Sequence, residues 1–415
     1  MFATCMRLAL TVAQHSTSPR LGILNTIRSH HAIPFGGAMA ATNFEPIANQ
    51  SGPMSLTVAA VNADPRIKDR ADYVCDGDDD HVEIQAALDS IGLGATVTLS
   101  QGTFDLGAAI LLDNRQTLQG QGEETVLIPS TPGDVSWAAQ DGEPIGALIE
   151  LARQDVSAAK ISRLRIEGRR SNYTLRGIYL NTTSNPISEP DAEHKLEHLV
   201  IQFCGSNPVY ITGVANRAGR TFDCRFTTNN AEWRQDGADW EHTQVDVSGT
   251  GILCDGANNR WVNCKSFFAG GLPGGANGLV PGHGFNIVSS RQTFAGCEAQ
   301  DCFGNGFHID AADTTISGCL ADSNGFNGTG TPTAGGQGNG FHISANRVII
   351  AGCSSIEKQE DARGQHQGWG YFVESGHNTL TIIGHANGNQ LGGFGGDTAD
   401  APDRNFQVIG DGATV

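Results

Sequence analysis

The sequence predicts an all-β protein built as a solenoid, in which one short structural unit repeats along the chain. Glycine accounts for 54 of the 415 residues, about 13% and nearly twice the usual share. A glycine followed by alternating apolar residues recurs at intervals of 22 to 34 residues. Short alternating segments separated by glycine-rich turns are typical of strands, and repeats of this length are typical of solenoids.

Composition excludes several classes of protein. The net charge of −18 argues against nucleic acid as a partner, because binding its backbone requires clustered Lys and Arg. No run of 18 apolar residues is present, so no membrane span is predicted. The ten cysteines form no CxxC pair, which disfavours zinc knuckles and thioredoxin-like sites.

Residues 1–50 are excluded from the predicted fold. Residues 1–44 contain no Asp or Glu, and the apolar patch at 8–13 is short for a signal peptide. Three interpretations remain: a targeting leader, a degraded secretion signal, or an upstream start codon before a true start at Met39. We favour the third and place the folded domain at residues 51–415.

The first ordered element predicted is a short helix over about residues 80–91. Asp80 precedes the apolar run, and Glu83 follows three residues later, which is the spacing of a capping box. A calcium loop of the EF-hand type is disfavoured because its glycine and its last glutamate are missing. An alternating strand at 95–100 and a turn at Gly102 follow.

This order of segments resembles the segment with which the β-helices of the pectate-lyase superfamily begin. The matching segments are the acidic run at 76–80, the helix, and the strand and turn that end near Phe104. The resemblance covers residues 72–130 by motif and the rest by its repeats. It implies a single-stranded right-handed parallel β-helix with an N-terminal capping helix. It does not imply one reaction, because lyases, hydrolases, epimerases and phage tail proteins share this fold.

Two columns of residues are predicted to point inward. Alignment on the repeat glycines places large apolar residues one and three positions later, and the side chains of a strand alternate between its two faces. The regular turns should extend over about residues 160–390. The two inward columns are Ile252, Phe285, Phe307, Phe341, Tyr371 and Cys254, Ile287, Ile309, Ile343, Val373.

A second set of repeats ends in cysteine. It contains Cys264, Cys297, Cys319 and Cys353, with Cys224 as an earlier member. We interpret this column as buried, free thiols packed at a corner of the solenoid.

The two columns between the inward positions are predicted to point outward. They are Leu253, Asn286, His308, His342, Phe372 and Asp255, Val288, Asp310, Ser344, Glu374. His308, His342, Asp310, Glu374 and Asp255 are therefore the predicted catalytic residues, and Asn286 and Phe372 are predicted to bind substrate. A structural role for such outward ladders is the alternative.

Three long insertions, at 267–283, 325–339 and 356–369, are predicted to border this outward face. All fall between a cysteine and the next repeat glycine. Binding groups collect on loops held by a rigid scaffold. The third insertion adds Lys358, Arg363, His366 and Trp369 to the predicted substrate-binding residues.

No cofactor or metal site is predicted. Residues 392–397 match half of a calcium-binding nonapeptide, but such sites need consecutive copies, so calcium remains an unsupported alternative. Gly282-His283-Gly284 resembles an element of polygalacturonases, but the accompanying elements are missing at matching places.

The predicted function is action on, or binding of, an extended polysaccharide. A lyase or epimerase would use His308 or His342 as base and acid, with Asn286, Arg363 or Lys358 neutralising a uronate. A hydrolase would pair Asp310 with Glu374 or Asp255. The alternative is a non-catalytic adhesin or phage tail module, which could be a homotrimer. An extracellular, virion-surface or cell-surface location is favoured.

Overall fold

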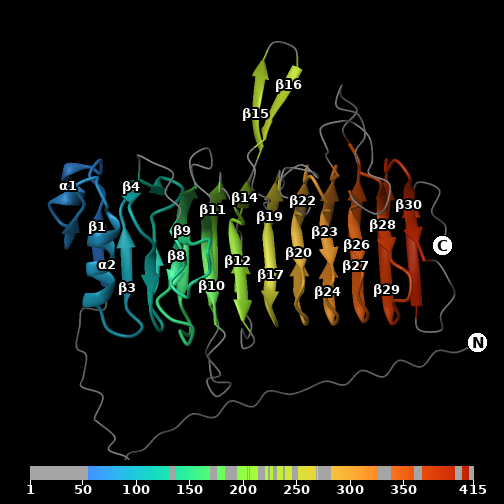
Figure 1. Cartoon of the computed structure of the whole chain (residues 1–415), viewed down its shortest axis with the longest axis horizontal. Helices are drawn as coiled ribbons and strands as arrows, with labels where there is room; N and C mark the ends of the chain where they lie inside the picture. Colours follow the sequence, from blue (N-terminus) through green and yellow to red (C-terminus); the bar gives the residue numbers. More distant parts are fainter. Residues whose placement is uncertain are drawn as a thin grey trace, which may run out of the picture. The chain divides into compact units, whose positions relative to one another are not determined.

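The chain forms a right-handed parallel β-helix in a computed structural model (Figure 1). The all-β class and the β-helix predicted from the sequence are confirmed. One side of the helix is a ten-stranded sheet. The structure describes residues 55–130, 137–168, 175–182, 194–202, 204, 206–213, 220–222, 225–227, 231–236, 239–244, 251–267, 269, 282–325, 338–358, 367–397 and 404–410.

The ten-stranded sheet carries the predicted outward columns. Every pairing in it is parallel. Its strands are β5 (Ile110–Leu112), β8 (Ala147–Leu151), β10 (Arg176–Asn181), β12 (Val209–Gly213), β17 (Ile252–Gly256), β20 (Phe285–Ile287), β23 (Phe307–Ile309), β26 (Phe341–Ile343), β28 (Trp369–Val373) and β30 (Gly392–Gly396).

The other large sheet has 19 strands and forms two parallel ladders. The first ladder runs through β1 (Ser55–Ala59), β3 (Thr96–Leu99), β6 (Thr117–Gln119), β9 (Lys160–Glu167), β11 (Lys195–Gln202), β13 (Arg220–Phe222), β18 (Arg260–Val262), β21 (Thr293–Ala295), β24 (Thr314–Ser317), β27 (Val348–Ile356), β29 (Leu380–Asn387) and β31 (Arg404–Gly410). The second contains β4 (Gly102–Leu106), β7 (Thr125–Pro129), β14 (Arg225–Thr227), β19 (Lys265–Phe267), β22 (Glu298–Gln300) and β25 (Leu320–Asp322), and it continues through the long strands β9, β11 and β27. The short strand β2 (Tyr73–Val74) pairs with β1.

One pair of strands departs from the predicted repeat. β15 (Ala231–Asp236) and β16 (Asp239–Gln244) form an antiparallel hairpin, which Figure 1 shows projecting from the coil. The sequence analysis did not predict this hairpin.

The inward columns form the core as predicted. Phe307 is fully buried, and its ring stacks between Phe285 and Phe341 at centroid distances of 4.7 and 4.9 Å. Tyr371 continues the stack 5.0 Å beyond Phe341. Aromatic pairs at such distances add to the hydrophobic contribution of burial, so this ladder holds consecutive turns in one register.

The cysteine column is a buried ladder of thiols, which confirms the prediction for the described cysteines. All eight of these are free and buried. The Sγ of Cys319 accepts from the backbone N–H of Cys297 at 3.3 Å, and the Sγ of Cys353 accepts from that of Cys319 at 3.3 Å. Cys224 lies outside the residues whose side chains are described.

The helix α2 (His81–Ser90) covers the N-terminal end of the coil, close to the predicted range; a one-turn helix α1 (Pro65–Lys68) precedes it. Ile84 and Leu88 of α2 are fully buried in the core. The Gln85 amide exchanges hydrogen bonds of 2.9 and 3.2 Å with the backbone of Leu111, in the first strand of the ten-stranded sheet. The helix therefore covers apolar residues and satisfies an otherwise open strand edge.

The predicted capping box is wrong. Asp80 precedes α2, but its side chain makes no capping hydrogen bond. Its carboxylate is fully buried and accepts from the backbone N–H groups of Gly77 and Asp105, each at 2.8 Å. It therefore ties the preceding loop to β4, a long-range role that local spacing does not reveal.

Candidate functional site

The outward face of the ten-stranded sheet presents one continuous row of side chains. The registers of the strand pairs place one residue of each strand from β8 to β30 opposite one residue of the next strand. Neighbouring strands are about 4.8 Å apart, so these side chains are close enough to act on one extended ligand. The row is Glu150, Tyr179, Tyr210, Leu253, Asn286, His308, His342, Phe372 and Gly395.

His308 is half-buried and lies near the middle of the candidate site. Burial lowers its pKa to about 4, assisted by His342, although Asp310 and Glu374 act in the opposite direction. Its Nδ1 lies 2.9 Å from Oδ1 of Asn286. Because that oxygen only accepts, Nδ1 carries the hydrogen and Nε2 carries the lone pair. The structure therefore presents a neutral imidazole, with Asn286 positioning it.

His342 is adjacent to His308, as predicted, with ring centroids 5.1 Å apart. The expectation that it faces solvent is wrong, because its exposed fraction is 7%. Its Nε2 lies 3.0 Å from Glu374 Oε1, and its Nδ1 lies 3.1 Å from Asn305 Nδ2. The amide donates to Nδ1, so Nε2 carries the hydrogen and donates to Glu374. His342 thus orients that carboxylate.

His283 is a third imidazole that the sequence analysis did not assign to the site. Its ring stacks on that of His308 at 4.4 Å, and its Nδ1 accepts from the Asn305 N–H at 3.0 Å. Burial, followed by the neighbouring imidazoles, holds the pKa of His283 well below its usual value. Its sequence position immediately before a repeat glycine was the available signal. It supports His308 from the buried side.

Two exposed carboxylates flank the histidines in the second outward column. Asp310 and Glu374 follow β23 and β28, and Ser344 lies between them. Ser344 Oγ donates to Asp310 at 3.3 Å. Two strand spacings correspond to about 9.6 Å between the backbones of Asp310 and Glu374. Both acids are available to a ligand on the face.

Aromatic side chains lie at the C-terminal end of the row. The Phe372 ring meets His342 edge-on at 5.3 Å. The Trp369 indole lies against Gly392 and Gly395 of β30, where an added Cβ on Gly395 would come within 2.3 Å of its ring. The glycine leaves space for the indole to lie on the strand. Both aromatic residues are partly exposed, as stacking on a sugar requires.

Asp255 is separated from the histidine pair. Its Oδ2 accepts from Tyr210 Oη at 3.2 Å and from Thr212 Oγ1 at 3.1 Å. A second cluster of the same kind lies one strand earlier, where Tyr179 Oη donates to Asp141 at 2.8 Å and Asn181 also donates to Asp141. The Tyr179 and Tyr210 rings stack at 5.2 Å.

These tyrosines were not predicted as site residues, although the sequence held the signal. The segment 177–181 is an early copy of the repeat, so Tyr179 occupies the same outward column as His308. Asp141 has no such signal, because it belongs to the irregular connection before β8.

Of the cations predicted from the third insertion, Lys358 is described, and it lies at the 19-stranded sheet and not at the histidines. Lys358 is exposed, its charge acts on Asp322 of β25, and its backbone N–H bonds Ser323. Arg363 and His366 lie outside the described residues.

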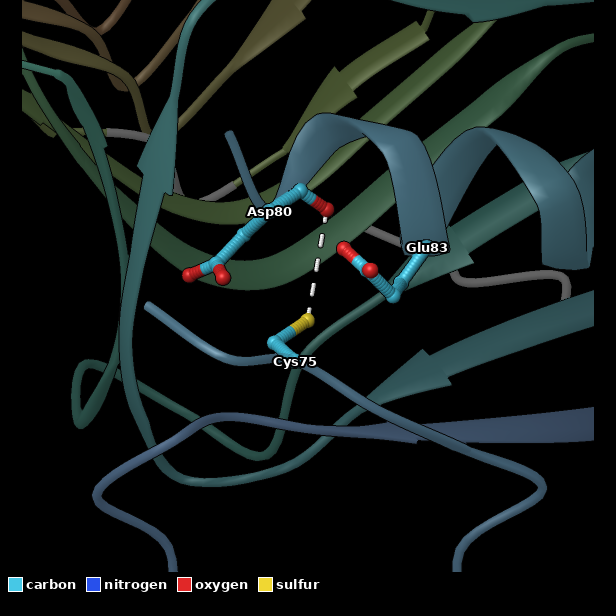
Figure 2. Close-up of side chains that lie close together, drawn as sticks. All are labelled: Cys75, Asp80 and Glu83. Carbon is cyan, nitrogen blue, oxygen red and sulfur yellow. Dashed lines mark hydrogen bonds between the residues drawn. The ribbon is translucent and has the colours of Figure 1, made fainter. Parts of the chain in front are cut away.

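One group of described side chains has the composition of a metal site. Cys75, Asp80 and Glu83 lie together near the start of α2 (Figure 2). The Cys75 thiol faces the carbonyl oxygen of Asp80 at 3.9 Å, whereas the Asp80 carboxylate makes the two backbone bonds described above. Burial raises the pKa of Cys75, which keeps the thiol protonated and a poor ligand. We therefore interpret this group as part of the packing at the N-terminal end of the coil and not as a metal site.

The half-motif for calcium at 392–397 has a structural explanation. Its glycines form β30, on which Trp369 lies. Asp397 pairs with Arg404 at 3.2 Å and accepts from the Gly376 N–H at 3.3 Å.

No family model and no curated protein matches the chain. Pectate lyase Pel9A has a similar fold: it is 14% identical, the match covers 86% of this chain and 80% of that one, and the TM-score is 0.42. The surface adhesin PfbA of Streptococcus pneumoniae is 11% identical, the match covers 75% of this chain and 83% of that one, and the TM-score is 0.46. A protein of Geobacillus virus E2 matches at 12% identity over 79% of this chain, which spans only 56% of the viral protein (TM-score 0.44). These are similarities of fold between proteins of different function.

Among the described residues, no helix is long and apolar enough to cross a membrane.

Proposed function

We propose that the protein binds an extended polysaccharide along the outward row and hydrolyses it between Asp310 and Glu374. The observation that carries the proposal is the placement of two exposed carboxylates in one column, two strands apart. Inverting glycosidases hold an acid and a base about 6.5–9.5 Å apart, which leaves room for the attacking water. The proposal requires the two carboxyl groups to lie slightly closer together than their backbones, and both of them bond residues of the intervening turn, Asp310 to Ser344 and Glu374 to His342.

The charges around His308 favour an uncharged sugar at this point. The charged groups that shift its pKa upward are the carboxylates Asp310 and Glu374. A uronate bound there would be repelled, and lyase chemistry requires its carboxylate to be neutralised. His308 and His342 then act as positioning residues, and Phe372 and Trp369 stack on the sugar rings.

A lyase or epimerase is the second candidate, favoured by the neutral His308. Its Nε2 lone pair could take the C5 proton of a uronic acid residue. Arg363 would then be needed to neutralise the carboxylate.

The test is incubation with a panel of neutral and uronic polysaccharides. Hydrolysis releases reducing ends; a lyase forms an ultraviolet-absorbing unsaturated product; an epimerase incorporates solvent deuterium at C5. We expect reducing ends alone, and a loss of at least about 100-fold in Asp310→Asn and Glu374→Gln. The control is Asp313→Asn, which removes an exposed carboxylate paired with Arg347 outside the row. Binding without reaction would contradict hydrolysis and indicate an adhesin.

A further inference from the structure

A cavity of about 520 Å³ lies at the N-terminal part of the outward row. It is formed by the connection before β8, the end of β8 with the segment that follows it, and β10. The volume lies within the range typical of small-molecule sites, about 300–1,000 Å³. Tyr179 and Glu150 belong both to its lining and to the row. The cavity is therefore continuous with the face proposed to bind the polysaccharide.

Asp141 is an exposed carboxylate held rigidly in this cavity. Tyr179 and Asn181 donate to its Oδ2, and the Glu143 N–H donates to its Oδ1 at 3.1 Å. Burial acts to raise its pKa, but the hydrogen bonds from Asn181 and Tyr179 outweigh it and lower the pKa. Asp141 therefore remains negatively charged in mildly acidic solution.

The remaining charged groups leave the cavity acidic. Arg153 pairs with Asp155 at 2.6 Å and with Asp113 at 2.8 Å, so two carboxylates offset its charge. Glu150 is buried, which raises its pKa, and its two oxygens accept from the N–H groups of Gln140 and Ala147. Glu150 thus holds the backbone on one side of the cavity, and the exposed Asp141 remains as a charged acceptor in the cavity lining.

Arg176 packs against the rings of Tyr179 and Tyr210 and is not among the residues that line the cavity. Its guanidinium lies 4.6 Å from the Tyr210 ring centroid and 5.1 Å from that of Tyr179, and it also pairs with Glu143 at 3.2 Å. Its exposed fraction is 5%, so it supports the rings and cannot meet an anionic ligand.

We propose that this cavity binds the ammonium group of an amino sugar within the polysaccharide. A rigid carboxylate with an excess of acceptors matches a ligand that brings positive charge and donors. Four strand spacings separate Tyr179 from His308, about 19 Å along the row. The cavity and the reaction centre therefore contact different sugars of one chain. This inference rests on the proposed function for the presence of a glycan on the face.

The test is calorimetric titration with the tetramer of β-1,4-linked glucosamine and with its N-acetylated counterpart, at a pH below the pKa of the amine. Acetylation removes the charge and keeps the sugar chain. We expect the glucosamine tetramer to bind at least tenfold more tightly. Asp141→Asn should abolish this difference, and circular dichroism should show that the variant is folded. Asp313→Asn should retain it.

Asp310→Asn separates the two proposals. This variant should lose hydrolysis and keep the preference for the amine, because Asp310 lies beside the histidines and does not line the cavity. Equal affinities for the two tetramers, or a preference that survives Asp141→Asn, would overturn the amino-sugar site while leaving hydrolysis at Asp310 and Glu374 standing.

Discussion

His308 should make the protein sensitive to mild acid, and His308→Gln should remove that part of the sensitivity. The folded state lowers the pKa of this imidazole from 6.5 to about 4, chiefly by burial. Between these values the unfolded chain binds more protons, so stability falls as the pH falls. Linkage gives a cost of about 0.2 kcal/mol at pH 7 and about 2 kcal/mol at pH 5 for this one residue.

The assay is urea unfolding of wild type and His308→Gln at both pH values. Between pH 7 and pH 5, the free energy of unfolding of wild type should fall by about 1.8 kcal/mol more than that of the variant. The buried His194, whose pKa is also lowered to about 4, contributes equally to both proteins and cancels in the comparison. The same pH dependence in both proteins would show that His308 is not held neutral by its surroundings.

Three further predictions concern packing. Phe307→Ala should lower the free energy of unfolding by about 3–5 kcal/mol in urea titrations, because it removes a fully buried ring from the stack; a loss below about 1 kcal/mol would disprove the inward column. The eight described cysteines should not react with a thiol reagent in the native protein and should all react in urea; rapid native labelling would contradict the buried ladder. Gly395→Ala should displace Trp369 and change tryptophan fluorescence; an unchanged spectrum would contradict the contact.

Much of the fold could be predicted because a β-helix repeats one local rule. Alternation of side chains along a strand assigned Phe307 to the core and His308 to the outer face, and the repeat glycines set the register between turns. The cysteine ladder followed from the same alignment.

The errors and omissions arise where long-range contacts decide. Asp80 bonds Asp105 of β4 rather than the first turn of α2. His342 is buried although its column points outward, because Asn305 and Glu374 surround it. Asp141 reaches Tyr179 across 38 residues from an irregular connection. None of these contacts has a local signature in the sequence.

The most direct test of the central claim is a crystal structure of Asp310→Asn with a bound oligosaccharide from the hydrolysed polysaccharide. The glycan should cross the strands of the ten-stranded sheet, from the Tyr179 cavity over His308 to Phe372. A glycan bound instead to the 19-stranded sheet would contradict the assignment of this row as the functional face.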